Sequence, residues 1–159
     1  MEKTRDELLE GYPIERRVFG TFFAFGNKLQ TAADSFYEEI TSKQFFMIMC
    51  LRLFQEKPPT IKELSHVMGS SHQNVKQIAL KLERQGYVEI VTDEKDRRKS
   101  RLKLTPKAAE LREKYGKQEV SFMEGLFEGI PKEDLAATYR TMAAIEENLA
   151  KIKRNEGVE

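Results

Sequence analysis

Cysteine, histidine and long apolar runs are scarce in this sequence, and each shortage excludes a class of protein. Cys50 is the single cysteine, so no disulfide can form within the chain, and we expect a reducing, cytoplasmic setting. No apolar run approaches the roughly 18 residues that a membrane-spanning helix needs, so no membrane partner is expected. The charged N-terminal stretch MEKTRDELLEGYP lacks the apolar segment of a signal peptide.

Groups that carry catalysis or bind metals are equally scarce. The two histidines, His66 and His72, lie on either side of an expected turn, with no second cysteine and no carboxylate pair at metal-ligand spacing. The sequence also has no phosphate-binding glycine loop and no Ser–His–Asp set. We therefore expect neither an enzyme nor a metal site, and no cofactor.

Charge, by contrast, is plentiful and unevenly distributed. Apolar residues make up 40% of the chain and charged residues 33%, with a net charge of only +1, which is typical of an ordinary soluble protein. Residues 60–105 nevertheless hold ten Lys and Arg against six Asp and Glu. Six positive residues and one negative residue fall between Lys95 and Lys103. This local surplus indicates an anionic partner more strongly than the net charge does.

The same segment has the layout of a helix, a turn, a second helix and a basic hairpin. Helices are predicted over Ile61–Met68 and Ser71–Gln85, with Gly69 at the turn and Gly86 ending the second helix. Two β-rich runs, YVEIVT and RLKLT, then flank the charged loop DEKDRRKS. This order predicts a winged helix-turn-helix, a mainly α fold with a small β-hairpin wing.

Apolar helices are predicted on both sides of this module. From Ile14 onward, apolar residues recur at helical spacing, and several phenylalanines widen the apolar surface beyond one face. We expect this helix to be buried against a second chain, with burial inside a monomeric core as the alternative. A capping box at Thr41 predicts a buried helix over Ser42–Phe54, and Pro106 and Pro131 begin two later helices. The expected regions are 1–40 and 106–159 for dimerisation and 41–105 for the winged helix-turn-helix, in one intertwined domain.

The second helix of the pair carries residue types that read DNA. Val75, Ala79 and Leu82 form its inward face, whereas Gln, Asn and Lys on the other faces suit base edges and phosphates. In helix-turn-helix proteins, the N-terminal residues of this helix reach the bases. A solvated polar face is the alternative. The candidate DNA-binding residues here are Ser70, Ser71, His72, Gln73, Asn74, Lys76, Gln77 and Lys81.

The hairpin loop gives the stronger indication of DNA. Like charges repel, so the positive surplus in this loop gains free energy only beside an anionic partner such as a phosphate backbone or a narrow minor groove. We expect Asp96 to brace the loop by pairing with Arg98, which would project into the minor groove. Phosphate contacts are expected from Arg97, Lys99 and Arg101. For any one of these residues, a solvated surface charge is the alternative.

The residues of this module resemble the multiple-antibiotic-resistance regulator (MarR) family of bacterial and archaeal transcription factors. The resemblance rests on ELSHVMGSS leading into NVKQIALKLERQGYV and then DEKDRRKSRLKLTPKA, with Asp96, Arg98 and the Leu104-Thr105 turn as its most specific parts. It implies a homodimer in which each subunit presents residues 71–85 to one half of a palindromic operator on double-stranded DNA. Many relatives also bind a small anionic or phenolic effector. Candidates for lining such a pocket are Phe22, Phe25, Phe46 and Tyr115, with core packing as the alternative.

Several positions depart from the pattern of that family. Ser70 follows Gly69 where relatives more often have an apolar residue, and Gln73-Asn74 stands where a small Ser/Thr pair is usual. We therefore expect an operator that differs from the commoner ones. The Lys57-Pro58-Pro59 linker is also unusual and is expected to affect how the chain enters the module.

Taken together, these features predict a dimeric, sequence-specific transcriptional regulator, acting as a repressor that a small ligand modulates. Two alternatives remain open. One is a winged-helix protein-interaction module that does not bind DNA. The other is a redox-sensing regulator that uses Cys50, although an apolar helix is expected to raise the pKa of that thiol and make it inert.

Overall fold

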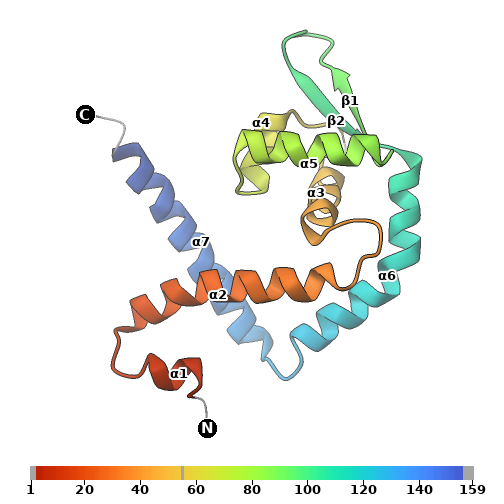
Figure 1. Ribbon diagram of the computed structural model, residues 1–159. Coiled ribbons are helices and arrows are strands. Elements are labelled where there is room, and N and C mark those ends of the chain that lie inside the picture. The colour runs from red at the N-terminus through yellow and green to blue at the C-terminus, as the bar shows by residue number, and fades with distance from the viewer. Residues whose placement is uncertain (1–2, 55, 156–159) are drawn as a thin grey trace. The chain divides into compact units, whose positions relative to one another are not determined.

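The computed structural model describes residues 3–54 and 56–155 (Figure 1). The described chain divides into two compact units, residues 1–116 and 117–159. Its elements are, in order, α1 (Arg5–Leu8), α2 (Ile14–Asp34), α3 (Ser42–Arg52), α4 (Ile61–Val67), α5 (His72–Arg84), β1 (Val88–Thr92), β2 (Ser100–Leu104), α6 (Pro106–Leu126) and α7 (Lys132–Asn155). The prediction of a mainly helical chain with a small β-hairpin is confirmed.

Local capping fixes where helices α3 and α4 begin. The Thr41 hydroxyl accepts a hydrogen bond from the Gln44 backbone N–H at 3.3 Å, and the Gln44 side chain accepts one from the Thr41 N–H at 2.8 Å. Thr60 and Glu63 form the same reciprocal pair at the start of α4. These capping boxes satisfy backbone donors that a helix start leaves free. The capping box predicted at Thr41 is confirmed.

The core of the first unit is built around α3. Met47 and Ile48 of this helix are fully buried, and they share one apolar core with Leu64 of α4 and Leu82 of α5. The α3 helix was predicted to be buried, and it is, although it ends at Arg52 rather than at Phe54. The winged helix-turn-helix therefore has an interior of its own.

The wing is an antiparallel hairpin in which Val88 lies opposite Leu104 and Thr92 lies opposite Ser100. The middle of β2 is joined to the linker that precedes α4. The Leu102 N–H donates to the Pro59 carbonyl at 2.9 Å, and Thr60 forms an isolated β-bridge with Arg101. The unusual Lys57-Pro58-Pro59 linker thus runs along β2, and it supports a ribbon that would be marginally stable alone.

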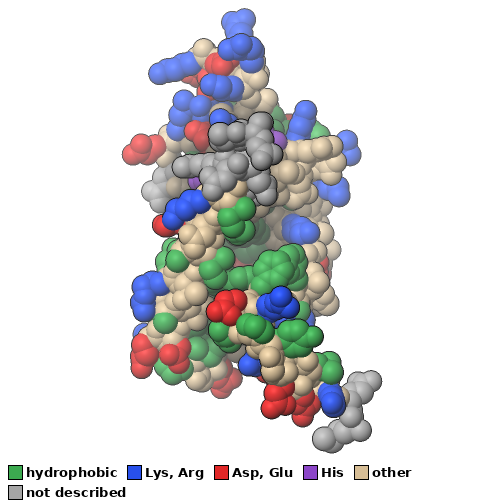
Figure 2. Space-filling model, turned by 90° about the vertical axis from the view of Figure 1, so that its left-hand side faces the viewer, with side chains coloured by type: hydrophobic (Ala, Val, Ile, Leu, Met, Phe, Trp, Pro, Cys, Tyr) green, Lys and Arg blue, Asp and Glu red, His purple; other side chains and the backbone are tan. Residues whose placement is uncertain are grey.

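Exposed apolar side chains are numerous in both units. In the first unit, no residue of α2 is fully buried, and Phe19, Phe23 and Phe25 are all exposed. In the second unit, exposed apolar side chains on α6 and α7 include Val120, Met123, Tyr139, Met142, Leu149 and Ile152. Figure 2 shows exposed hydrophobic side chains in green on one face. Patches of this kind mark interaction surfaces, whereas none of the described helices is long and apolar enough to cross a membrane.

Candidate nucleic-acid interface

The α5 helix has one buried face and one exposed face, as an element that reads DNA requires. Val75, Ala79 and Leu82 are completely buried, which confirms the inward face predicted for this helix. Gly69 adopts a positive φ of 59° at the turn before it, a conformation that glycine tolerates best. Ser71 is the N-cap, and its hydroxyl accepts from the Asn74 N–H at 3.2 Å.

The C-terminal end of α5 is fixed to the rest of the unit by a polar chain. The buried Gln44 side chain of α3 donates to the Gln85 side-chain oxygen at 2.9 Å. The Gln85 side-chain nitrogen in turn donates to the Glu39 carbonyl at 2.9 Å. Because one end of α5 is tied down in this way and one face is buried, its exposed N-terminal face is held in a defined direction.

The exposed side chains at the N-terminal end of α5 differ in how much of their hydrogen-bonding capacity is already used. The Asn74 side-chain amide donates to the Ser70 hydroxyl at 2.8 Å, so part of its hydrogen-bonding capacity is already used. In the part of the chain that the structure describes, no hydrogen bond is found for the exposed Gln73 side chain. Of these two predicted base readers, Gln73 is the one whose amide is available to a ligand.

A hollow of about 790 Å³ lies between the N-terminal ends of α4 and α5 and the wing. It brings together six of the predicted DNA-binding residues. These are His72, Gln73, Lys76, Arg98, Lys99 and Arg101. The other seven candidates lie outside its lining. These are Ser70, Ser71, Asn74, Gln77, Lys81, Asp96 and Arg97.

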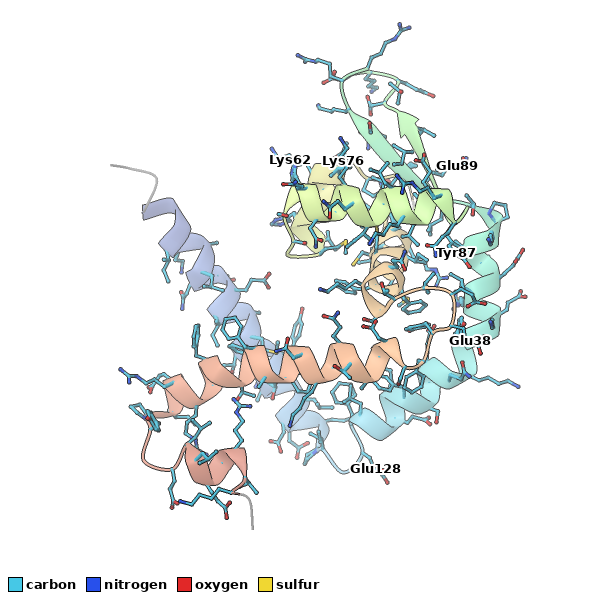
Figure 3. The ribbon with its side chains drawn as sticks, viewed as in Figure 1. Glu38, Lys62, Lys76, Tyr87, Glu89 and Glu128 are labelled. Atoms are coloured by element: carbon cyan, nitrogen blue, oxygen red, sulfur yellow. The ribbon has the colours of Figure 1, made fainter. Side chains whose placement is uncertain are left out.

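Lys62, in the first turn of α4, is a lining residue that sequence reasoning missed. Its side chain is exposed, and it shares the hollow with Lys76 of α5 (Figure 3). The first helix of a helix-turn-helix crosses the DNA backbone. A lysine two residues after the Thr60 cap was therefore a signal that could have identified it.

The wing tip contains the predicted pair of Asp96 and Arg98. The Asp96 carboxylate accepts from the backbone N–H and from the side-chain Nε of Arg98, both at 3.2 Å, and Lys99 Nζ lies 3.4 Å away. The hydrogen bonds from Arg98 lower the pKa of the Asp96 carboxyl. The Arg98 side chain is nevertheless 92% exposed. Figure 2 shows basic side chains, in blue, at the wing tip at the top of the view.

Arg101, in contrast, is held inside the subunit. Its side chain is 14% exposed, its Nη1 donates to the Pro58 carbonyl at 2.6 Å, and its Nε pairs with Asp93. Glu63 lies 3.6 Å from Nη1. The sequence-based expectation that Arg101 contacts phosphate therefore needs correction, because these partners occupy two of its donor nitrogens and hold it against the linker.

The four residues suggested for a ligand pocket line neither the hollow beside the wing nor the two smaller hollows near Leu53 and Pro58. Phe22, Phe25 and Phe46 are exposed. Tyr115 is instead a core residue, whose hydroxyl accepts from the Glu38 N–H at 3.2 Å and donates to the Glu39 carboxylate. It packs against the Tyr37 ring with centroids 5.2 Å apart. For Tyr115 the pocket expectation is wrong, and core packing is correct.

The remaining reactive side chains offer little chemistry. Cys50 is buried, and this burial raises the pKa of its thiol, which leaves little of the reactive thiolate. Within the described ranges, no three His, Cys, Asp or Glu side chains gather as a metal site would require. His66 and His72 are thus not part of such a group.

Comparison with known proteins agrees with this geometry. Residues 44–99 match the MarR family model. A MarR/EmrR family transcriptional regulator from Acinetobacter sp. ADP1 superposes with a TM-score of 0.76 at 18% identity, covering 87% of this chain and 99% of that one. The S. aureus MepR–DNA complex has a TM-score of 0.72 at 18% identity, with 80% and 94% covered. No curated protein matches the sequence.

A MarR transcriptional regulator from Methanosarcina mazei Go1 is similar at 27% identity, with a TM-score of 0.68 over 86% of this chain and 99% of that one. These similar proteins from Acinetobacter and Methanosarcina are both described as transcriptional regulators. Residues 44–99 form a MarR-family domain, and they lie in a chain that has the fold of MarR-family transcriptional regulators.

Proposed function

We propose that this protein is a dimeric, sequence-specific DNA-binding repressor that acts on a palindromic operator and is modulated by a small ligand. The observation that carries the proposal is the hollow that unites the exposed end of α5, the first turn of α4 and the basic wing. A concave surface lined by lysine, arginine and glutamine suits a duplex, because basic groups gain beside phosphates and glutamine can read a base edge.

Each part of this surface has a separate task in the proposal. Lys62, Lys76 and Lys99 neutralise phosphates, which positions the protein without selecting a sequence. Gln73 reads bases in the major groove, where the donor and acceptor pattern differs for every base pair. Arg98 enters the minor groove beside it, at a distance from α5 that the wing sets.

The dimer is supported by the exposed apolar surfaces of both units. A second copy that covers the phenylalanines of α2 would remove them from water, and a two-fold symmetric pair would present two α5 helices to a palindromic site. A ligand that favours one spacing of these helices over another would change the affinity for the operator. The exposed Phe22, Phe25 and Phe46 are the remaining candidates to contact it.

Arg98→Ala tests the wing. We expect the affinity for the operator to fall by about 1–3 kcal/mol for each lost contact, because the positively charged Arg98 side chain is 92% exposed at the wing tip. The measurement is a binding titration on an operator obtained by selection from random DNA, at about 0.15 M salt, the ionic strength at which steering by exposed charges is already well screened.

Arg97→Ala is the matched control for Arg98→Ala, because it removes the same charge from the neighbouring exposed position. It should weaken binding to all DNA sequences alike. It should also reduce the slope of log affinity against log salt by about one, as the loss of a phosphate contact does. Equal effects of the two substitutions, or an unchanged affinity for Arg98→Ala, would show that Arg98 has no special role.

Gln73→Ala tests base reading by α5. We expect it to relax base preference at one position in each operator half by about 1–3 kcal/mol, because a bidentate amide contact would be lost. Binding to a panel of single-base operator variants measures this change. Gln77→Ala, which alters an exposed residue outside the hollow, should leave the preference intact. A uniform loss on every operator variant would assign Gln73 to phosphate instead.

Salt dependence separates DNA binding from a winged-helix module that binds only proteins. Each neutralised phosphate contributes roughly −0.9 to the slope of log affinity against log salt. A DNA-binding protein of this kind should therefore give a slope of several units with mixed-sequence DNA. A slope near zero would favour the protein-interaction module.

A further inference from the structure

Asp93 is a buried carboxylate in an otherwise solvated loop. Only 4% of its surface is exposed. Among the described residues, it is the only Asp, Glu, Lys, Arg or His that is buried. Burying a charge is costly unless it is paired and hydrogen-bonded. An apolar residue would stabilise the start of the hairpin loop at lower cost, so this carboxylate needs an explanation other than stability alone.

The contacts of Asp93 extend in two directions. On one side, its carboxylate pairs with Nε of Arg101, whose Nη1 donates to the Pro58 carbonyl of the linker at 2.6 Å. On the other side, Asp93 Oδ1 accepts from the backbone N–H groups of Lys95 and Asp96 at 2.9 and 2.8 Å. The Arg101 hydrogen bond is the largest cause of the strongly lowered pKa of the Asp93 carboxyl, so the group is ionised throughout the neutral range.

The second direction leads to the wing tip. The Asp96 backbone, fixed by Asp93, carries the carboxylate that accepts from both the backbone N–H and Nε of Arg98. The Asp93 N–H also donates to the Lys99 carbonyl at 2.9 Å, which closes the loop around these residues. A continuous series of polar contacts therefore runs from the linker before α4 to the guanidinium of Arg98.

We propose that Asp93 and Arg101 are positioning residues that fix the direction and reach of Arg98 relative to α5, an inference that rests on the proposed DNA-binding function. Neither side chain needs to touch DNA. The linker is joined to α4, and α4 lines the hollow together with α5. The position of Arg98 is thus fixed relative to the hollow as well as to its own hairpin. The Arg98 side chain therefore loses less conformational freedom when DNA binds.

Asp93→Asn is the principal variant, because it keeps the shape of the side chain but removes the charge that holds Arg101. Glu94→Gln is the matched control, since it neutralises the adjacent, exposed carboxylate of the same loop. Arg101→Gln breaks the same series of polar contacts at the linker. It replaces Asp93→Asn as the test variant if Asp93→Asn lowers the melting temperature. All three are made in the full chain, with dimer state and thermal melting measured first.

A double-mutant cycle with Arg98→Ala tests the inference on DNA. We expect Asp93→Asn to weaken operator binding roughly two- to tenfold in the wild-type background and to have less than about a twofold effect once Arg98 is alanine. A merely structural role would weaken both backgrounds by the same factor. That equal loss would overturn the inference, as would an unchanged affinity for Asp93→Asn in the wild-type background.

The side-chain Nε–H signal of Arg98 in nuclear magnetic resonance gives a readout that needs no DNA. We expect this signal to move toward that of an unstructured arginine in Asp93→Asn and Arg101→Gln, and to stay in place in Glu94→Gln. An Arg98 signal that is the same in all four proteins would overturn the positioning role. If the wild-type protein binds no DNA while the signal shifts as expected, the proposed function fails and the positioning of Arg98 stands.

Discussion

Phe23→Glu is expected to dissociate the proposed dimer into monomers and to abolish tight binding to the proposed operator. Phe23 is 65% exposed in the single chain, and its ring packs edge-on against that of Phe19 at 5.2 Å. In a symmetric dimer the substitution removes two buried rings, each worth about 1.5–3 kcal/mol, and places two carboxylates in an apolar interface. The dimer dissociation constant should rise at least about a hundredfold.

The loss of DNA affinity follows from the loss of the dimer. Two linked α5 helices bind a palindrome with far higher affinity than one, because the second contact is made at high effective concentration. Sedimentation and operator titration at the same protein concentrations measure both effects. Lys28→Glu is the control, since it places a carboxylate on an exposed position of α2 that lies roughly 140° round the helix from Phe23. A Phe23→Glu protein that stays dimeric would contradict the proposed interface.

Leu82→Ala should destabilise the protein by about 2–5 kcal/mol, the range for deleting a fully buried leucine side chain. Leu82 is 0% exposed and lies on the inner face of α5, so the substitution leaves a cavity beneath the C-terminal half of this helix. Urea unfolding, followed by circular dichroism at one fixed protein concentration, measures the change, because the stability of a dimer depends on concentration.

Lys81→Ala is the control for Leu82→Ala, because it alters the adjacent, exposed residue of the same helix. Lys81→Ala should change the free energy of unfolding by no more than about 0.5 kcal/mol, as most surface substitutions do. At the same time it removes one predicted phosphate contact. Similar stabilities for the wild type and Leu82→Ala would mean that α5 is not packed on the core as described.

The parts of the fold that the sequence predicts are those encoded by short-range signals. The capping box at Thr41 depends on a residue three positions away, and the helix–turn–helix depends on one glycine between two apolar stripes. The pair of Asp96 and Arg98 is likewise two residues apart. Signals of this range can be read without knowledge of the tertiary structure.

The side-chain roles that sequence reasoning misjudged depend on partners that are distant in the chain. Arg101 lies in a basic run and resembles a phosphate contact, but its acceptors are Asp93, across the hairpin, and the Pro58 carbonyl, 43 positions away. Tyr115 resembles a pocket aromatic, but its hydroxyl binds Glu39, 76 positions away. Neither pairing has any local signature, since both arise only when the hairpin and the α6 helix have docked.

The hydrogen bond between Ser70 and Asn74 joins two of the positions at which this chain departs from the usual family pattern. In the proposed function, the Ser70 hydroxyl thereby decides how much of the Asn74 amide remains free to read a base. In evolutionary terms, the proposed operator preference can change in two ways. The module can replace a base-reading residue, or it can release Asn74 by a single substitution at Ser70. The turn before α5 is therefore a second place at which new DNA specificities can arise while every base-contacting side chain is retained.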